Sequence, residues 1–480
     1  MEYSDLVSGT VVSATVEEYV RSLMVSRLSR VSIAIVGSGL AGLTAAYRLM
    51  QRGYTVDVYE ARKRVGGRVF SVRVGDTIGE LGALNISDGG SAPYTCSLIG
   101  ELGLTVENKE WHAPMRSLLP FFENDVLTTY ANKLEQYHFT SEQLREKLAE
   151  LRNNACSMSD VLNKLFPDDP DTRRSCSMRL AAYEGASPEI LSSWYVETLY
   201  HILMGGLSSV HPAKKVRLYT YIKGGNSKLP EALALTLKGH VHTEKVLATV
   251  MRKDYSYVLS FTDGERINAD IVILAVPGSV YHAISIDPSI ISPDQYATMH
   301  SLPYGTNAKI VVPIENPTHH QSTCTNGRVL LWRAFEESLV TMYYVYQYGI
   351  FDGRSITAVF NRDLPFLKAL YTQDVRYTAP IVAAHDIQDG RYCGPVGHSW
   401  VNDPYARGSF SCIAAGFEDI LLSTGQYCGE PVKLLFTPRH NSFFFIGEHT
   451  TTDYAIIGTM EAAVESAERT VRMIDRMMCS

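Results

Sequence analysis

Residues 31–60 of this 480-residue chain read VSIAIVGSGLAGLTAAYRLMQRGYTVDVYE, and this stretch decides the fold. Residues 31–36 are a short apolar run rich in Val and Ile, as is typical of a buried strand. Apolar residues then recur at helical spacing over 40–52, and 55–59 is again strand-like. The stretch therefore predicts a strand, a helix and a second strand parallel to the first, which is the βαβ unit of an α/β fold.

A glycine motif joins the first strand to the helix. Gly37, Gly39 and Gly42 form the pattern G-x-G-x-x-G, and Leu40 and Ala41, inside the pattern, begin the helix. In this context the first glycine permits a tight turn, the second lets backbone amides approach a pyrophosphate, and the third lets the helix pack closely on the strand. The phosphates would then lie at the helix N-terminus.

Glu60 and the loop after it narrow the choice of nucleotide. An acidic residue at the end of the second strand accepts hydrogen bonds from an unphosphorylated ribose, which favours FAD or NAD over NADP. The loop continues as Ala61-Arg62-Lys63-Arg64-Val65-Gly66-Gly67-Arg68. Its glycine pair can bring backbone close to a longer cofactor, and its arginines can offset phosphate charge. These features favour FAD, with an NAD dehydrogenase as the alternative.

The rest of the sequence indicates that two domains are interleaved. Strand-like runs return at Tyr257–Thr262 and Asp270–Val276, and the end of the chain alternates a strand with a helix. Between about 90 and 220 the apolar spacing is mostly helical, with helix start signals at Thr140 and at Ser187. We expect an N-terminal extension over 1–30, a discontinuous Rossmann-like FAD-binding domain over 31–90, 222–300 and 430–480, and a substrate-binding domain of mixed sheet plus helical insertion over 91–221 and 301–429.

Composition bounds the class of protein. The formal charge of -7 gives no basic field for nucleic acid, whereas a cationic substrate is compatible with it. The eight cysteines are far apart and form no C-x-x-C pair, which indicates reduced thiols in the cytoplasm, and no metal site is predicted. The sequence contains no apolar run of membrane-spanning length and no signal peptide is expected. A homodimer, the commonest soluble oligomer, is the assembly we would expect.

In their order and spacing, the motifs resemble those of the flavin-containing amine oxidase family, which includes monoamine oxidases, polyamine oxidases, L-amino-acid oxidases and lysine-specific histone demethylases. The resemblance runs from about Ser32 to the C-terminus. Besides the glycine motif and the loop 60–68, it rests on Glu80-Leu81-Gly82-Ala83, Gly224-Gly225-x-x-x-Leu229, Ala275-Val276-Pro277, Lys309, Trp400, Phe445-Ile446-Gly447-Glu448-His449-Thr450 and Gly458-Thr459-Met460-Glu461-Ala462-Ala463.

The resemblance implies which residues hold FAD. Around the adenosine and pyrophosphate it implies Gly37, Gly39, Leu40, Ala41, Gly42, Glu60, Ala61, Arg62, Arg64, Gly67 and Arg68, with the backbone of Val246 at the adenine. Toward the ribityl chain and isoalloxazine it implies Gly82, Ala83, Leu84, Pro277, Trp400, Gly447, Glu448, Thr459, Met460 and Ala463. A helix that begins after Gly458 would also direct its positive dipole at the flavin edge where negative charge gathers on reduction.

Several positions depart from the pattern of the family. Some members tether FAD through a cysteine, but the matching residue here is Ser409, so we expect noncovalent FAD. Phe410 matches one wall of the aromatic sandwich of monoamine oxidases, whereas the second wall falls on Thr459, which implies a half-open cage for a larger or differently held amine. Asn85 stands where amino-acid oxidases place an arginine for the substrate carboxylate. This disfavours an amino acid as the substrate without excluding it, because Arg333 or Arg354 could bind the carboxylate instead.

The resemblance implies an oxidase that passes a hydride from the carbon next to a neutral amine to flavin N5, giving an imine, with O2 reoxidising the flavin to yield H2O2. Lys309 matches the lysine that holds a water against flavin N5 in the family, and Phe410, Thr459 and Trp400 would line the site of the amine. An L-amino-acid oxidase, an FAD-dependent C–C desaturase of the protoporphyrinogen or carotenoid type, and a non-catalytic FAD-binding module remain alternatives.

Overall fold

A five-stranded parallel sheet organises the computed structural model, which describes residues 31–86, 92–111, 121–123, 126–128, 137, 139–204, 217–314, 323–326, 329–333, 339–344, 356–370, 381–383 and 392–479. The strand order is β23-β13-β1-β2-β9, and every neighbouring pair is parallel. The strands are β1 (Ser32–Val36), β2 (Thr55–Tyr59), β9 (Val241–His242), β13 (Ile271–Leu274) and β23 (Phe443–Phe445). Segments far apart in sequence thus form adjacent strands.

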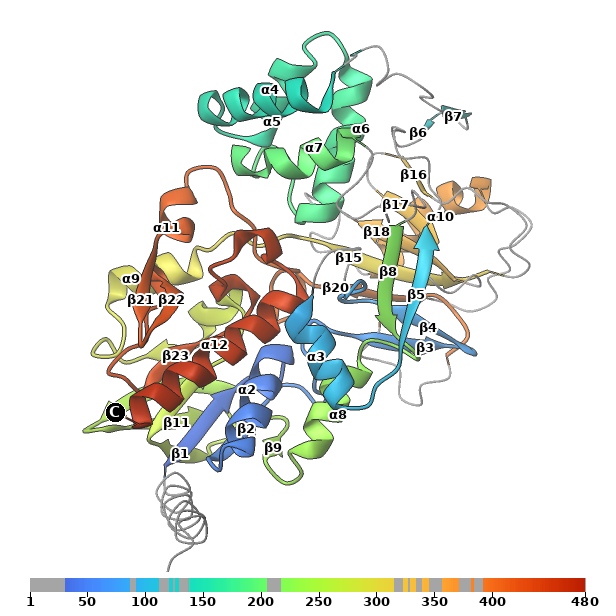
Figure 1. Ribbon diagram of the computed structural model, residues 1–480. Helices are drawn as coiled ribbons and strands as arrows, with labels where there is room; N and C mark the ends of the chain where they lie inside the picture. Colours follow the sequence, from blue (N-terminus) through green and yellow to red (C-terminus); the bar gives the residue numbers. More distant parts are fainter. Residues whose placement is uncertain are drawn as a thin grey trace, which may run out of the picture.

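Both faces of this sheet are covered, which explains why β1, β13 and β23 are almost entirely apolar. Alternate residues of β1 point to opposite sides: Ile33 and Ile35 join the core under the helices, and Ala34 and Val36 join the core on the other face. The helix layer contains α2 (Leu40–Gln51), α3 (Pro93–Glu101), α8 (Lys228–Thr236) and α12 (Met460–Cys479), and α12 lies along α2 (Figure 1). The opposite layer contains β10 (Leu247–Lys253), β11 (Ser256–Phe261), β12 (Arg266–Ala269), β14 (Ser285–Ile286), η3 (Gly278–Ala283) and α9 (Pro293–His300).

A second, eight-stranded sheet has the order β19-β20-β15-β18-β17-β16-β6-β7. Its strands are β6 (Phe121–Glu123), β7 (Val126–Thr128), β15 (Ala308–Pro313), β16 (Thr323–Thr325), β17 (Val329–Arg333), β18 (Leu339–Tyr344), β19 (Val382–Ala383) and β20 (Val396–Ser399). Helix α10 (Ile356–Leu370) packs on one face through Phe360 and Leu367. The hairpin β3 (Ser71–Val74) and β4 (Thr77–Glu80) packs through Val72 against Val311 of β15, on the other side of that strand.

Four helices form a separate layer at the top of Figure 1: α4 (Ser141–Asn154), α5 (Met158–Leu165), α6 (Pro170–Glu184) and α7 (Val196–Met204), with the short η2 (Ser193–Tyr195). The helix start at Thr140 is confirmed, because Thr140 and Gln143 form a reciprocal capping box. The helix start at Ser187 is wrong. Residues 187–190 form a turn, and Leu191 and Ser192 are then drawn into bridges with Ala414 and Ser157, which keeps this stretch extended.

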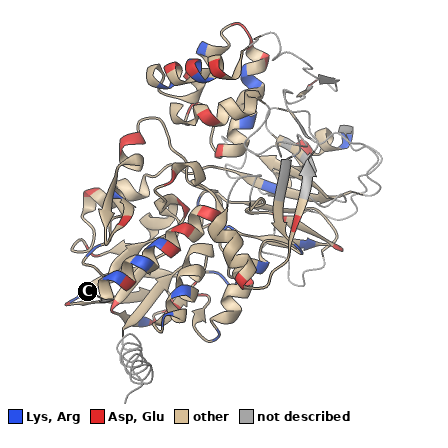
Figure 2. Cartoon of the chain, viewed as in Figure 1, with Lys and Arg blue, Asp and Glu red and all other residues tan. Residues whose placement is uncertain are grey.

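The remaining elements complete an α/β fold of two sheets with a helical insertion, as expected. The stretch expected to be mostly helical also contains strands: β6, β7, β5 (Val106–Trp111) and the start of β8 (Arg217–Ile222), and β5 and β8 pair antiparallel. Near the C-terminus follow α11 (Glu418–Leu422), β21 (Thr424–Tyr427), β22 (Glu430–Lys433), η5 (Leu434–Phe436), η6 (Glu448–Thr450) and η7 (Tyr454–Ile456). Charges of both signs are interspersed along α4 and α12 (Figure 2). In the described ranges, no helix is both long and apolar enough to cross a membrane.

Candidate active site

The glycine motif forms the turn between β1 and α2, at the carboxyl edge of the parallel sheet. The φ of Gly37 is +107°, and its amide donates to Tyr59 O at 2.8 Å. A Cβ added to Gly42 would lie 2.0 Å from Gly37 O, whereas a Cβ added to Gly39 would meet no protein atom within 4 Å. The protein itself therefore requires the first and third glycines. At the second glycine, Gly39, the space that a side chain would occupy is free of protein atoms, as a motif that holds a pyrophosphate requires.

The second glycine pair lies directly against this turn. Gly66 donates to Ser38 O at 2.9 Å and forms a parallel bridge with Gly39. A Cβ added to Gly67 would lie 3.3 Å from the Cα of Gly39. The two loops, separated by about one βαβ unit in sequence, thus present their backbones together at the N-terminus of α2, where Leu40 and Ala41 are buried.

Glu60 joins the two loops through its carboxylate, which is only 3% exposed. Oε2 accepts from the amide and the hydroxyl of Ser38, both at 2.8 Å, and Oε1 accepts from the amide of Arg62 at 2.9 Å. An ionised carboxylate has about four acceptor sites, so one remains for a ribose hydroxyl. Glu60 O also accepts from Lys245 N, which brings the neighbouring Val246 to this end of the sheet.

The three arginines of the loop 61–68 have different surroundings. Arg62 forms an ion pair with Asp403 at 2.6 Å, and the guanidinium of Arg64 lies 3.8 Å from the centre of the Phe70 ring. Burial lowers the pKa of Arg64 to about 10, so it stays cationic at neutral pH. In the described part of the chain Arg64 forms no ion pair, which leaves its charge available to a phosphate.

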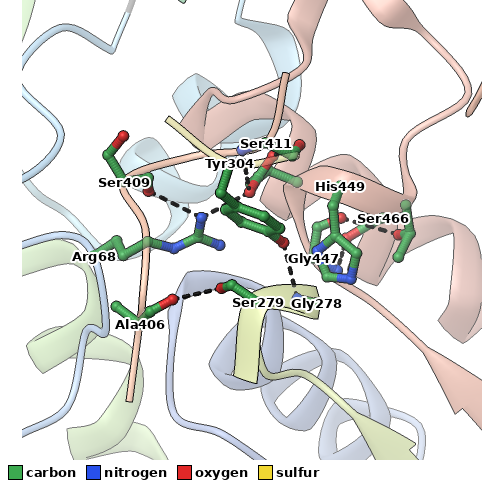
Figure 3. A network of polar contacts seen from close by, with 12 residues as sticks. Arg68, Gly278, Ser279, Tyr304, Ala406, Ser409, Ser411, Gly447, His449 and Ser466 are labelled. Carbon is green, nitrogen blue, oxygen red and sulfur yellow. Dashed lines mark hydrogen bonds and ion pairs between the residues drawn. The ribbon is translucent and has the colours of Figure 1, made fainter. Parts of the chain in front are cut away.

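Arg68 is instead engaged by the protein, in the polar network of Figure 3. Its Nη1 donates to Glu448 Oε1 at 2.7 Å and to Ser409 O at 3.0 Å. Ser411 donates to both oxygens of Glu448, from its amide at 3.2 Å and its hydroxyl at 2.5 Å. Burial alone would raise the pKa of Glu448, but Arg68 and these donors hold it below its ordinary value, so the carboxylate is ionised.

The same network ties three distant loops together, and Tyr304 is its central ring. The Tyr304 hydroxyl accepts from the Gly278 amide at 2.8 Å, and the Arg68 guanidinium lies 5.8 Å from its ring (Figure 3). The Gly447 amide donates to Ser466 Oγ at 3.0 Å, which fixes the start of η6 to α12. Pro277, next to Gly278, and Gly447 are thereby held at the same edge of the sheet as the glycine motif.

Lys309 lies on β15 of the eight-stranded sheet, and its side chain points toward this edge of the parallel sheet. Its side chain is buried, and Nζ donates to Gly82 O at 2.6 Å. Burial lowers the pKa of Lys309 to about 8, although the nearby carboxylate of Glu80 acts in the opposite direction. Tyr343 of β18 is the strand partner of Lys309, and the centre of its ring lies 5.6 Å from Nζ. Lys309 is therefore still mostly cationic at neutral pH.

Residues 82–84, which include the acceptor of the Lys309 hydrogen bond, are held by contacts with Arg68 and Asn226. A Cβ added to Gly82 would lie 2.1 Å from Arg68 O, and the Ala83 amide donates to that same oxygen at 3.1 Å. The side-chain amide of Asn226 donates to Ala83 O at 3.2 Å and to Leu84 O at 2.6 Å. The next residue, Asn85, has a buried Oδ1 without a hydrogen-bond partner in the described residues.

Trp400 closes the opposite side of this loop. Its indole Nε1 donates to Leu81 O at 3.0 Å, and its ring packs edge-on against His398 at a centroid distance of 4.3 Å. His398 Nε2 lies 3.2 Å from the Asp403 carboxylate, whose other oxygen pairs with Arg62. Trp400 is thus held by the same chain of contacts that starts at Glu60.

The N-terminus of α12 and Phe410 meet on the far side of the site. Thr459 Oγ1 accepts from the Ala462 amide at 3.2 Å and donates to Ile456 O at 2.6 Å, so Thr459 caps the helix that begins at Met460. Ala463 lies within the first turn. Atoms of the Phe410 ring lie 2.7 Å from a Cβ added to either Gly458 or Gly185. Phe410 therefore lies between two glycines, where no side chain would fit.

Ser409 and Cys412 bear on how a cofactor could be attached. Ser409 Oγ donates to Asn307 Oδ1 at 2.5 Å. Cys412 is buried in the apolar core of the helical insertion, and burial raises the pKa of its thiol to about 12. A thiol with that pKa stays protonated and unreactive at neutral pH.

The structure thus gathers the sequence-predicted residues around one edge, but several residues that hold them there were not predicted. Tyr304, Asn226 and His398 contact Arg68, Leu84 and Phe70 respectively, each more than 100 residues away in sequence, so no local pattern could indicate them. Of the two arginines that could replace the carboxylate-binding arginine, Arg354 and the side chain of Arg333 lie outside the described residues. The described residues contain no group of three or more His, Cys, Asp or Glu side chains that could hold a metal.

Comparison with known proteins gives a consistent result. A family described as "Flavin containing amine oxidoreductase" matches residues 40–474. The L-amino-acid oxidase of Mus musculus is 25% identical over 476 residues, covering 91% of this chain and 69% of that protein. The structure of cyclohexylamine oxidase from Brevibacterium oxydans IH-35A is similar with a TM-score of 0.69 at 15% identity, over 94% of this chain and all of that one. A triple mutant of putrescine oxidase gives 0.67 at 19% identity, over 94% and 99%.

Proposed function

Because the chain belongs to the family of flavin-containing amine oxidoreductases, we propose that it is an FAD-dependent oxidase that acts on the C–N bond of a small-molecule amine and uses O2 as acceptor. The observation that carries the proposal is Lys309, a buried ammonium that donates to the backbone of Gly82 at the edge where the glycine motif lies. A lysine with a purely structural role would not need to be buried at this edge. A lysine that stabilises the charge developing in a redox reaction would need this position.

The residues present fit FAD. The turn at Gly39, the carboxylate of Glu60 and the cation of Arg64 would hold the adenosine and pyrophosphate. Gly82, Pro277 and Trp400 would hold the isoalloxazine, and the first amides of α12 at Met460 lack acceptors within the helix, as helix N-termini do, and would serve its pyrimidine edge. Glu448 would take the ribityl chain with its remaining acceptor capacity, since Arg68 and Ser411 already occupy part of it.

The chain supplies the surroundings of the reaction. Bound FAD would accept a hydride from the carbon next to the amine nitrogen, leaving an imine, and O2 would reoxidise it with formation of H2O2. Phe410, Tyr343 and Trp400 would surround the amine with apolar rings, and such surroundings favour the neutral amine, because burial disfavours the charged form. Lys309 has two N–H groups left after its bond to Gly82 O, so it can hold a water or an oxygen species at Nζ.

The visible spectrum of the purified protein tests the proposal. We expect an oxidised-flavin band that bleaches on anaerobic mixing with a pool of monoamines or of diamines and returns when air is admitted, with release of H2O2. Bleaching by L-amino acids alone would instead identify an amino-acid oxidase, and a flavin band that no amine or amino acid bleaches would contradict the proposed reaction.

The second prediction concerns attachment of the flavin. We expect acid precipitation of the holoprotein to release all of the FAD into the supernatant, because Ser409 cannot form a thioether and the thiol of Cys412 is protonated in an apolar core. Flavin that stays with the precipitate and migrates with the denatured chain in a gel would contradict noncovalent binding.

The third prediction is the pH dependence of reoxidation. The ammonium of Lys309 is present below its pKa of about 8 and lost above it, so the rate at which O2 reoxidises the reduced protein should fall as pH rises through about 8. We expect Lys309→Met to be about tenfold slower at pH 7 and insensitive to pH between 6.5 and 9.5 in stopped-flow measurements.

A second buried lysine provides the control for this profile. Burial also lowers the pKa of Lys433 to about 8, and its Nζ donates to His449 O at 3.0 Å. The Lys433→Met variant should keep the pH dependence of the unmodified protein. If that variant loses the pH dependence while Lys309→Met keeps it, the assignment of the profile to Lys309 is wrong.

A further inference from the structure

Glu80 is a carboxylate at the end of β4, two residues before Gly82, whose carbonyl accepts from Lys309. Strand β4 packs directly on β15, since a Cβ added to Gly79 would lie 2.9 Å from the side chain of Val311. Alternate residues of a strand share a face, so Lys309 and Val311 lie on the same face of β15. The end of β4 therefore lies on the side of β15 to which the lysine extends.

The carboxylate of Glu80 holds the loop that follows β4. Its Oε1 accepts from the amide of Asn226 at 2.8 Å, and Ser71 Oγ lies 2.9 and 2.8 Å from its two oxygens. The side chain of Asn226 in turn donates to the carbonyls of residues 83–84 at 3.2 and 2.6 Å. Asn226 is fully buried, so this connection is shielded from water. Glu80 is thus joined by hydrogen bonds to the loop that accepts from the lysine.

The other titratable neighbours of Lys309 are neutral. On the two strands that flank β15, the residues paired with Lys309 are Tyr343 and His398. Burial raises the pKa of the Tyr343 hydroxyl and lowers the pKa of His398, so neither carries a charge at neutral pH. Burial also raises the pKa of Glu80, to about 7, although its hydrogen bonds and the charge of Lys309 act in the opposite direction. Glu80 is therefore largely ionised where Lys309 titrates.

Cations on the elements next to Glu80 are engaged elsewhere: Arg68 with Glu448, Arg73 with Asp76, and Lys228 against Gly224. Among the described residues, Lys309 is thus the cation whose charge acts on Glu80. A buried ammonium is destabilised by desolvation, and an opposite charge nearby favours its charged form.

We propose that Glu80 is a positioning residue for Lys309: its hydrogen bonds fix the loop that accepts from Nζ, and its negative charge favours the protonated form of the lysine. The inference rests on the proposed function, in which the charge of Lys309 promotes reoxidation by O2. Within the described ranges no ion pair joins the two groups, so Glu80 acts through the loop and through its charge, without direct contact with Nζ.

The test compares two substitutions in the holoprotein. Glu80→Gln removes the charge but keeps an oxygen that can accept from Asn226 and Ser71, so the loop should keep its position. Glu231→Gln is the matched control, because Glu231 is exposed on α8 and its charged neighbour is Lys228. The flavin is reduced by light in the presence of EDTA, without any amine, and its reoxidation by O2 is followed by stopped flow between pH 6.5 and 9.5.

In the unmodified protein and in Glu231→Gln, the rate of reoxidation should fall through about pH 8. In Glu80→Gln the midpoint should lie about one pH unit lower, the lower end of what a nearby opposite charge causes, so that reoxidation at pH 8 is about threefold slower. The difference should disappear toward acid pH, where the lysine is charged in both proteins.

The effect should also require the lysine, so adding Glu80→Gln to Lys309→Met should change the profile no further. A purely structural carboxylate would leave the midpoint unmoved, because Gln keeps its hydrogen bonds. A midpoint that stays at about 8 in Glu80→Gln, or a shift of equal size in the background of Lys309→Met, would overturn the inference.

A measurement on the lysine itself separates this inference from the proposed function. In protein isotope-labelled at the ε carbon of lysine, the NMR resonance that is missing from Lys309→Met reports the protonation of Lys309 with or without FAD. We expect its midpoint to fall in Glu80→Gln but not in Glu231→Gln, and equal midpoints in all three proteins would overturn the inference. If no amine reduces the flavin, the proposed reaction fails, and this midpoint still decides on Glu80.

The unmodified protein decides if Glu80→Gln does not fold. Because Glu80 ionises near pH 7 and Lys309 near pH 8, the two titrations are coupled, and the curve of the Lys309 resonance should be broader than that of one isolated group. A curve that fits a single group would contradict the coupling.

Discussion

Replacement of Gly42 by alanine is expected to give a protein that contains no flavin. The added methyl would lie 2.0 Å from Gly37 O and 3.2 Å from the Cβ of Ala275. Gly37 has little freedom to retreat, because its amide is bonded to Tyr59 O and its φ of +107° is already fixed by the turn. Relief of such an overlap requires α2 to move off β1, which costs about 3 kcal/mol or more and disrupts the turn.

Gly39→Ala is the matched control for this prediction, because a Cβ at Gly39 meets no protein atom and its φ of -67° suits alanine. We expect Gly39→Ala to fold with the Tm of the unmodified apoprotein and to lose affinity for FAD only. Gly42→Ala should lose both affinity and Tm. Flavin content and thermal unfolding of the two variants, with and without added FAD, measure the difference. A Gly42→Ala variant that contains a full complement of FAD and has a normal Tm would refute the close contact of α2 with the turn.

Arg68→Met is expected to destabilise the fold by about 3–5 kcal/mol, the usual cost of leaving one member of a buried ion pair behind. Glu448 would remain, 4% exposed, with the hydroxyl and amide of Ser411 as its only donors among the described residues. The same substitution frees Ser409 O and the loop that carries Phe410, so FAD affinity should fall as well.

The loss of stability in Arg68→Met should depend on pH. The folded protein holds the pKa of Glu448 below its ordinary value, so the pair contributes stability above the unfolded pKa and loses it as pH falls through the folded pKa. Without Arg68, burial raises the pKa of Glu448, and the carboxyl is protonated more readily. The loss of Tm in Arg68→Met should therefore be largest near pH 7 and shrink toward acid pH.

Two further variants check the cause. Adding Glu448→Gln to Arg68→Met removes the stranded charge and should restore part of the lost Tm. Arg73→Met removes an exposed arginine, whose carboxylate neighbour Asp76 is 3.8 Å away, and should leave the Tm nearly unchanged because exposed pairs contribute little. An Arg68→Met variant with the Tm of the unmodified protein, or a double variant no better than the single one, would contradict the role of the buried pair.

What the sequence predicts well is what lies within one stretch of chain. The βαβ unit, the capping box at Thr140 and the strands of the parallel sheet follow from apolar spacing and turn residues, and the structure has them. The start of a helix at Ser187 failed because Leu191 and Ser192 pair with Ala414 and Ser157, residues that no local pattern relates to them.

The candidate site divides in the same way. The backbone of the glycine loops could be predicted, because only glycine permits the turns. The partners of the charged groups could not: Arg68 was expected to offset phosphate charge, but it pairs with Glu448, 380 positions later. The capping of α12 by Thr459 was not predicted either, and it leaves the expected place of Thr459 beside the amine a prediction.

The strand order β23-β13-β1-β2-β9 has a consequence for how the protein is made. During synthesis the ribosome releases β1, α2 and β2 early, yet β1 acquires its second neighbour only when β13 appears, and β13 waits for β23, some 170 residues further on. Contacts of such high sequence separation form slowly and leave apolar strand edges exposed in the meantime. The five-stranded sheet can therefore be completed only after β23 has been synthesised, and we expect the edges of β1 and β13 to stay unpaired until their neighbours emerge.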